Sequence, residues 1–236
     1  LPFVKAGLPG VFVTPDVTPY KKRKVRILNG AHTAFVPGSW VAGFDIVRDC
    51  MHDETIRGFM NTMLYDEVIP TLAADLDVED CKAFAAAVEN RFDNPFIDHA
   101  LLSICLNSTA KWRARDLPTL KDYVAETGNL PKCLSTSLAT LIAFYTQELV
   151  AREGDGLHLR RADGTEYTAQ DDAFVLDFYA AHAGVDDAEL VHDVLTNEQM
   201  WGEDLTQIAG LEEFVVNALA VVRAEGVKQA FANAQA

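Results

Sequence analysis

Apolar residues recur at helical spacing through most of this chain, and the pattern predicts a mainly α protein. One clear stripe begins after Asp53, which is typical of a helix N-cap, and ends before Pro70. Its apolar side chains are three or four residues apart: Ile56, Phe59, Met60, Met63, Leu64 and Val68. Similar spacing predicts further helices over about residues 22–35 (closed by Pro37-Gly38), 78–92, 134–149, 172–183, 188–195 and 211–232.

Glycine and proline mark the segments that interrupt the helical pattern. Gly154, Gly156 and the Asp163-Gly164 pair flank short alternating runs, which is typical of a β-hairpin. The opening segment, residues 1–20, is rich in proline and glycine, and residues 11–13 within it are compatible with one short strand. The predicted fold class is therefore mainly α, a single multi-helical domain with at most a small β-hairpin.

The charge balance narrows the range of partners. The 236 residues include 35 acidic and 20 basic ones, which gives a net charge of −15 at pH 7. Nucleic acids and anionic membrane surfaces both favour a basic protein face, so neither is expected as a partner. An anionic small molecule would need a local positive pocket. The two densest basic clusters are residues 21–26 and the group Lys111, Arg113 and Arg115.

Metal and disulfide chemistry receive no support from the sequence. The four cysteines are far apart, lie among apolar residues and form no Cys-x-x-Cys pair, so we expect buried free thiols. The histidines show none of the usual zinc spacings. No apolar run has the length of a transmembrane helix, and no signal peptide is recognisable. These features predict a metal-free protein of the reducing cytoplasm.

The densest group of candidate catalytic side chains is Lys24, Asn29 and His32. In an α-helix Asn29 would lie about 140° around the axis from Lys24, and His32 about 80°, so all three can face one cleft. A lysine whose pKa is lowered by burial can act as a general base, while an amide and an imidazole can donate hydrogen bonds to an oxygen that gains charge. The alternative is a solvated basic face before a core helix, with His32 an ordinary partly buried histidine. Gly30, which is unfavourable inside a helix, indicates close approach by substrate or by neighbouring backbone.

A longer pattern surrounds these residues. Residues 20–43 contain a Lys, four residues, an Asn, two residues and a His, and segments 94–111 and 201–207 continue the pattern. In these segments the chain resembles the C-terminal domain of the polyol-specific long-chain dehydrogenases, the mannitol dehydrogenase family. The resemblance implies a helical catalytic and substrate-binding domain over residues 21–236, with residues 1–20 as the connector from an N-terminal nucleotide-binding Rossmann domain. The chain has no Gly-x-Gly-x-x-Gly motif, so NAD is expected on that other domain, and the isolated chain is expected to be inactive.

The resemblance also implies roles for individual residues. Lys24 is expected to be the general base that takes the proton of a secondary hydroxyl, with Asn29 stabilising the substrate oxygen and His32 orienting it. The mannitol and fructuronate branches of the family carry Asp-Gly-Ser where this chain has Asn107-Ser108-Thr109. Together with residues 99–104 and 201–207, this run resembles the branch that interconverts the sugar acids altronate and tagaturonate. The residues expected to bind the substrate are Lys111, Arg113, Arg115, Asn107 and His99.

Three alternatives stay open at the level of sequence. The substrate could be another one handled by the same family, either mannonate and fructuronate or the neutral polyol mannitol. The chain could instead be a stand-alone helical domain that binds a sugar acid without catalysis. Arg113 and Arg115 could also pair with Asp116 or Glu126, whereas an arginine that binds substrate would grip a carboxylate with two hydrogen bonds.

Overall fold

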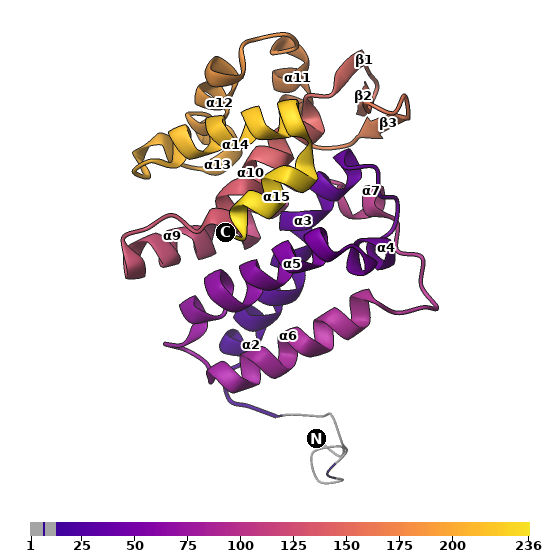
Figure 1. Cartoon of the computed structure of the whole chain (residues 1–236). Helices are drawn as coiled ribbons and strands as arrows, with labels where there is room; N and C mark the ends of the chain where they lie inside the picture. Colours follow the sequence, from indigo (N-terminus) through magenta and orange to yellow (C-terminus); the bar gives the residue numbers. More distant parts are fainter. Residues whose placement is uncertain (1–6, 8–12) are drawn as a thin grey trace.

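The computed structural model describes residue 7 and residues 13–236, which form a bundle of helices with one small sheet (Figure 1). At the centre lies α10, Lys132–Tyr145, in which every residue after Lys132 is buried. Helices α3, Gly30–Val41, and α14, Leu211–Glu225, both pack against α10. The mainly α fold predicted from the apolar spacing is confirmed.

One long helical run carries the first candidate residues. It consists of α2, Thr18–Arg23, a π-helical segment η1, Lys24–Asn29, and then α3. The predicted end at Pro37-Gly38 was wrong, because α3 continues to Val41 with the proline inside it. Proline lacks the N–H that would bond to the preceding turn. Every residue of α3 from Thr33 to Trp40 is nevertheless buried, so tertiary packing outweighs that loss.

The predicted stripe after Asp53 forms the next part of the bundle. Asp53 caps α5, Glu54–Thr62, by accepting hydrogen bonds from the N–H groups of Thr55 and Ile56. All six apolar residues of the stripe are buried, which confirms the prediction. The elements on either side of α5 are α4, Val47–His52, a second π-helical segment η2, Met63–Val68, a 3-10 turn η3, Pro70–Leu72, and α6, Val78–Phe92, which has the predicted bounds.

Three helices lead from α6 to the central helix: α7, Leu101–Ile104, α8, Ser108–Arg115, and α9, Leu117–Thr127. The helix predicted to reach residue 149 ends at Tyr145, because the chain then enters the sheet. This sheet is an antiparallel meander of β1, Glu148–Glu153, β2, Gly156–Arg160, and β3, Glu166–Ala169. Leu159 of β2 lies opposite Leu149 and Tyr167, so the predicted hairpin is present and a third strand extends it.

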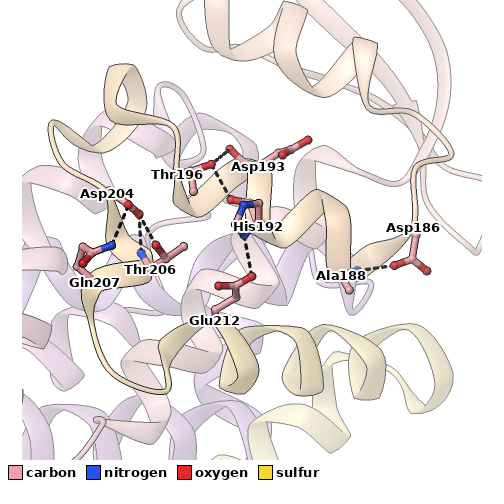
Figure 2. Close-up of polar contacts among 9 residues, drawn as sticks. All are labelled: Asp186, Ala188, His192, Asp193, Thr196, Asp204, Thr206, Gln207 and Glu212. Carbon is pink, nitrogen blue, oxygen red and sulfur yellow. Dashed lines mark hydrogen bonds and ion pairs between the residues drawn. The ribbon is translucent and has the colours of Figure 1, made fainter.

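The C-terminal part is helical, as Figure 1 shows in orange and yellow. Figure 2 shows the contacts that hold α12, Asp187–Leu195. Asp186 caps its first turn, and His192 Nδ1 lies 2.9 Å from Glu212 Oε1 on α14. The single helix predicted over 211–232 is two helices, because Gly226 breaks it with a φ of 90°. The remaining elements are α11, Ala173–Ala181, α13, Glu198–Trp201, η4, Leu205–Gln207, and α15, Val227–Ala234.

The remaining expectations concern the cysteines, the opening segment and membrane-spanning helices. All four cysteines are buried and free, as predicted. The short strand expected at residues 11–13 falls outside the described residues, apart from Val13. Within the described part of the chain, no helix combines the length and the apolar character that crossing a membrane requires.

Candidate active site

A cavity of about 310 Å³ opens beside the junction of η1 and α3. One wall is the last turn of α6, which packs against both η1 and α4. Another wall is the loop that follows α6. The N–H of Val47 donates to the carbonyl of His99 at 3.0 Å, and Arg48 bonds to Asp98 at 2.6 Å, so α4 holds this loop in place. The lining residues are Leu28, Asn29, His32, Val47, Arg91, Phe92, Ile97 and His99.

The π-helical segment changes the relation between Lys24 and Asn29. Backbone hydrogen bonds in a π-helix join residues five apart, and the N–H of Gly30 indeed bonds to the carbonyl of Val25. Lys24 and Asn29, also five apart, therefore lie on the same side of the helix, closer than the α-helical angle of about 140°. Asn29 lines the cavity, whereas Lys24 is exposed and is not a lining residue. The described residues alone do not bury this lysine.

His32 presents an unused hydrogen-bonding atom at this site. Its Nε2 is buried and has no hydrogen-bond partner among the described residues. The ring stacks on Phe92, with centroids 4.1 Å apart, and meets the ring of His99 edge-on at 5.5 Å. Burial lowers the pKa of His32 to about 3, helped by the nearby positive charges, so the ring is neutral near pH 7. An unpaired buried nitrogen is unfavourable, and a hydrogen bond to a ligand would relieve it.

Lys111 and Arg115, both on α8, already have partners within the protein. The Lys111 ammonium donates to the carbonyl of Ile104 at 2.9 Å. Arg115 Nη1 donates to Thr33 Oγ1 at 3.0 Å and to the carbonyl of Asn29 at 3.4 Å. Burial lowers the pKa of both cations. Arg115 therefore supports the backbone that carries Asn29.

The other expected substrate-binding residues lie in different places. His99 lines the cavity. Arg113 is exposed, and its guanidinium lies over Gly202 of the turn after α13, away from the cavity. Asn107 is exposed and takes a left-handed conformation, with φ at 53°, just before α8. The first turn of α8 is capped instead by Asp171, which accepts from the N–H of Thr109 at 3.1 Å.

Sequence reasoning missed several residues of the cavity, of which Arg91 is the one with a charge. Arg91 is in the last turn of α6, where basic residues are common because they complement the helix dipole. Its side chain reaches the cavity only because α6 packs against η1. The sequence offered no local signal for that contact.

The chain is similar to known proteins over most of its length. Residues 16–223 match the mannitol dehydrogenase C-terminal domain. The chain is 42% identical over 226 residues to altronate oxidoreductases of Escherichia coli and Shigella flexneri, which covers 93% of this chain and 44% of each relative. Its fold is similar to that of Pseudomonas fluorescens mannitol 2-dehydrogenase in a ternary complex with NAD and D-mannitol. That likeness has a TM-score of 0.80 and 22% identity, and covers 95% of this chain and 42% of the other.

A D-sorbitol dehydrogenase in a substrate-free form has a similar fold as well, with a TM-score of 0.76 and 20% identity over 98% of this chain and 43% of the other. The chain thus spans less than half the length of the relatives that it matches. The matched region contains Lys24, Asn29 and His32 together with the whole cavity. This chain belongs to the mannitol dehydrogenase C-terminal domain family, a family of oxidoreductases.

Proposed function

We propose that this chain is the substrate-binding and catalytic domain of an NAD-dependent oxidoreductase that interconverts D-altronate and D-tagaturonate. The observation that carries the proposal is the cavity beside η1, which joins Asn29 and the unpaired Nε2 of His32 in a chain 42% identical to altronate oxidoreductases. Lys24 lies on the same side of the π-helical segment as Asn29. An amine, an amide and a neutral imidazole are suited to moving a proton at a secondary alcohol.

In the proposed reaction each of the three side chains acts on the same substrate oxygen. Lys24 Nζ takes the proton of the hydroxyl during oxidation and returns it during reduction. The Asn29 amide and a neutral His32 ring hold that oxygen through hydrogen bonds, which strengthen as negative charge develops on it. Lys24 is exposed in this domain. A second domain that covers it would favour the neutral amine, which is the form that accepts a proton.

When bound, NAD would accept the hydride. The described residues do not form a site that fits this dinucleotide. The sheet is a three-stranded antiparallel meander, without the parallel strand–helix–strand unit that holds dinucleotides. We therefore assign NAD to a Rossmann domain of the same polypeptide. The relatives support this assignment, because this chain matches only 44% of their length.

The charges around the cavity favour an anionic substrate. The protein carries a net charge of −15, yet the ionisable side chains of the described residues that lower the pKa of His32 are all basic: His99, Arg115, Arg91 and Lys111. A sugar acid would be attracted to this positive region. A neutral polyol would gain nothing from it, which makes altronate and tagaturonate better candidates than mannitol.

The test is a hydride-transfer assay that follows NADH absorbance, on the polypeptide that joins this chain to its nucleotide-binding domain. Altronate, mannonate and mannitol are compared side by side. Lys24→Ala should abolish altronate-dependent NADH formation, while Lys21→Ala removes an equivalent exposed charge one turn earlier and should leave it intact. Turnover of mannonate or mannitol alone would reassign the substrate. Binding of a sugar acid without turnover of any of the three would favour a non-catalytic binding domain.

A further inference from the structure

Arg91 lines the cavity, and its guanidinium has no partner among the described residues. Its side chain is exposed and forms no hydrogen bond or ion pair with any described residue. Acidic residues outnumber basic ones by 35 to 20, and other arginines of the bundle, such as Arg26 and Arg48, have carboxylate partners. An arginine left unpaired in such an acidic protein is available to an external anion.

The position of Arg91 ties it to the catalytic candidates. The next residue, Phe92, ends α6 and stacks on the ring of His32. Arg91 and His32 both line the cavity, and the positive charge of Arg91 helps to lower the pKa of His32. A substrate whose hydroxyl meets Asn29 and His32 would therefore extend toward Arg91 along the cavity.

The other cations near the cavity are less suited to hold a substrate. Lys111 donates its ammonium to the carbonyl of Ile104, and Arg115 is bonded to Thr33 and Asn29. If either cation bound a substrate instead, a partly buried carbonyl or hydroxyl group would lose its hydrogen bond, which is unfavourable. Arg91 can bind an anion without breaking any bond described in the protein.

We propose that Arg91 binds the carboxylate of the sugar-acid substrate and thereby determines the preference for an acid over a neutral polyol. The inference rests on the proposed function, whose substrate class it explains. The planar guanidinium can donate two parallel hydrogen bonds to a carboxylate, a geometry that a lysine ammonium cannot reproduce. The cavity of about 310 Å³ is within the size range of sites for small molecules.

The experiment compares Arg91→Gln and Arg91→Lys with the unaltered polypeptide that includes the nucleotide-binding domain. Lys82→Gln is the matched control, since it removes one positive charge from the same helix at a surface pair with Glu79. Altronate and altritol, its neutral sugar alcohol, are compared by steady-state kinetics and by calorimetric titration. Arg91→Gln should raise the KM and Kd for altronate about 10- to 100-fold, with kcat changed less than about twofold. Values for altritol should not change, and Arg91→Lys should recover part of the loss.

Each other result has a definite meaning. Turnover of altronate with the same KM in Arg91→Gln and Lys82→Gln would overturn the inference and leave the proposed function in place. A fall in kcat for altronate and altritol alike would also overturn it, because it would show a structural role. If the unaltered protein does not turn over altronate, the proposed function fails. The titrations with altronate and mannonate then decide the inference separately, since it survives only if a sugar acid binds and Arg91→Gln weakens that binding.

Discussion

The carboxyl group of Asp116 lies directly against Gly30, at the point where η1 passes into α3. A Cβ added to Gly30 would lie 2.8 Å from Asp116 Oδ1, which is closer than side chains approach in practice. Asp116 is buried, and its Oδ2 has no hydrogen-bond partner among the described residues. Burial raises the pKa of Asp116 well above its usual range, although Arg115 and Arg26 oppose the rise. The glycine therefore admits a neighbouring side chain, and not the substrate or backbone expected from the sequence.

Gly30→Ala should destabilise the protein, despite the better helix propensity of alanine. Propensity favours alanine by about 1 kcal/mol, whereas overpacking of a buried contact costs about 1–3 kcal/mol. We expect a net loss of up to about 2 kcal/mol in the free energy of unfolding, measured by urea denaturation. The same substitution in an Asp116→Ala background should be neutral or stabilising. An equal loss in both backgrounds would show that Asp116 is not the obstacle.

The fold was largely predictable because its signals are local. The apolar stripe after Asp53 and the helix over 78–92 follow from spacing and capping alone, and both are confirmed. One error arises where long-range packing overrides local preference, since Pro37 lies inside α3 because the surrounding residues are buried. The other is local, because the positive φ of Gly226 divides the last helix in two.

The site was less predictable for the same reason. The spacing of Lys24, Asn29 and His32 indicated a segment that borders the cavity, but nothing in that spacing indicates a π-helical segment. The Arg115 contact with the Asn29 carbonyl and the close approach of Asp116 come from a distant part of the chain. Arg91 likewise reaches the cavity through tertiary packing, so its charge could not be placed from the sequence.

His32→Ala should lower kcat/KM for altronate by about a hundredfold, the usual effect of losing an oriented hydrogen-bonding group at a charge-developing oxygen. His52→Ala is the matched control, because His52 is exposed and bonded to Asp93 at 2.7 Å on the surface. The assay is the same NADH measurement. Equal activity in the two variants would remove His32 from the proposed mechanism.

The ring of His32 should also stay neutral over the working pH range. Burial lowers its pKa to about 3, whereas the bond to Glu212 raises the pKa of His192 above its usual value. In a histidine-observed NMR titration from pH 5 to 8, the signals of His32 should not move, while those of His192 should move. A titration of His32 in this range would mean that its surroundings are far more polar than the structure indicates.

Arg115→Ala should lower kcat while leaving the KM for altronate nearly unchanged. Arg115 holds the carbonyl of Asn29 and the hydroxyl of Thr33, so its loss should misplace the Asn29 amide without removing a substrate contact. We expect a fall in kcat of about tenfold or more, which corresponds to about 1.4 kcal/mol of barrier. Arg113→Ala, at Gly202, is the comparison that separates this role from a general loss of charge on α8. A selective rise in KM for the acid in Arg115→Ala would restore it as a carboxylate ligand.

Glu67 makes the stability of the bundle depend on pH. Its carboxylate accepts from the N–H groups of Cys133 and Leu134 at 2.7 and 2.9 Å, at the start of the central helix α10. Only 5% of Glu67 is exposed, and burial raises its pKa from 4.5 to about 7 even though those hydrogen bonds act to lower it. The folded state thus holds this proton more tightly than the unfolded state. The stabilisation that this bound proton contributes to the folded state is fully present below about pH 4.5 and is lost as the pH rises through 7.

Glu67→Gln removes this titration and should flatten the pH dependence. The rise of its pKa from 4.5 to about 7 corresponds to about 3 kcal/mol in the free energy of unfolding. The measurement is urea denaturation at intervals from pH 4.5 to 8, and the quantity of interest is the difference between the unaltered protein and the variant at each pH. That difference should change by about 3 kcal/mol across the range, in favour of the variant at high pH. Glu79→Gln, at an exposed pair with Lys82, is the control and should show a nearly constant difference. A constant difference for Glu67→Gln as well would mean that Glu67 is ionised in the folded protein throughout this range, its hydrogen bonds to α10 outweighing its burial.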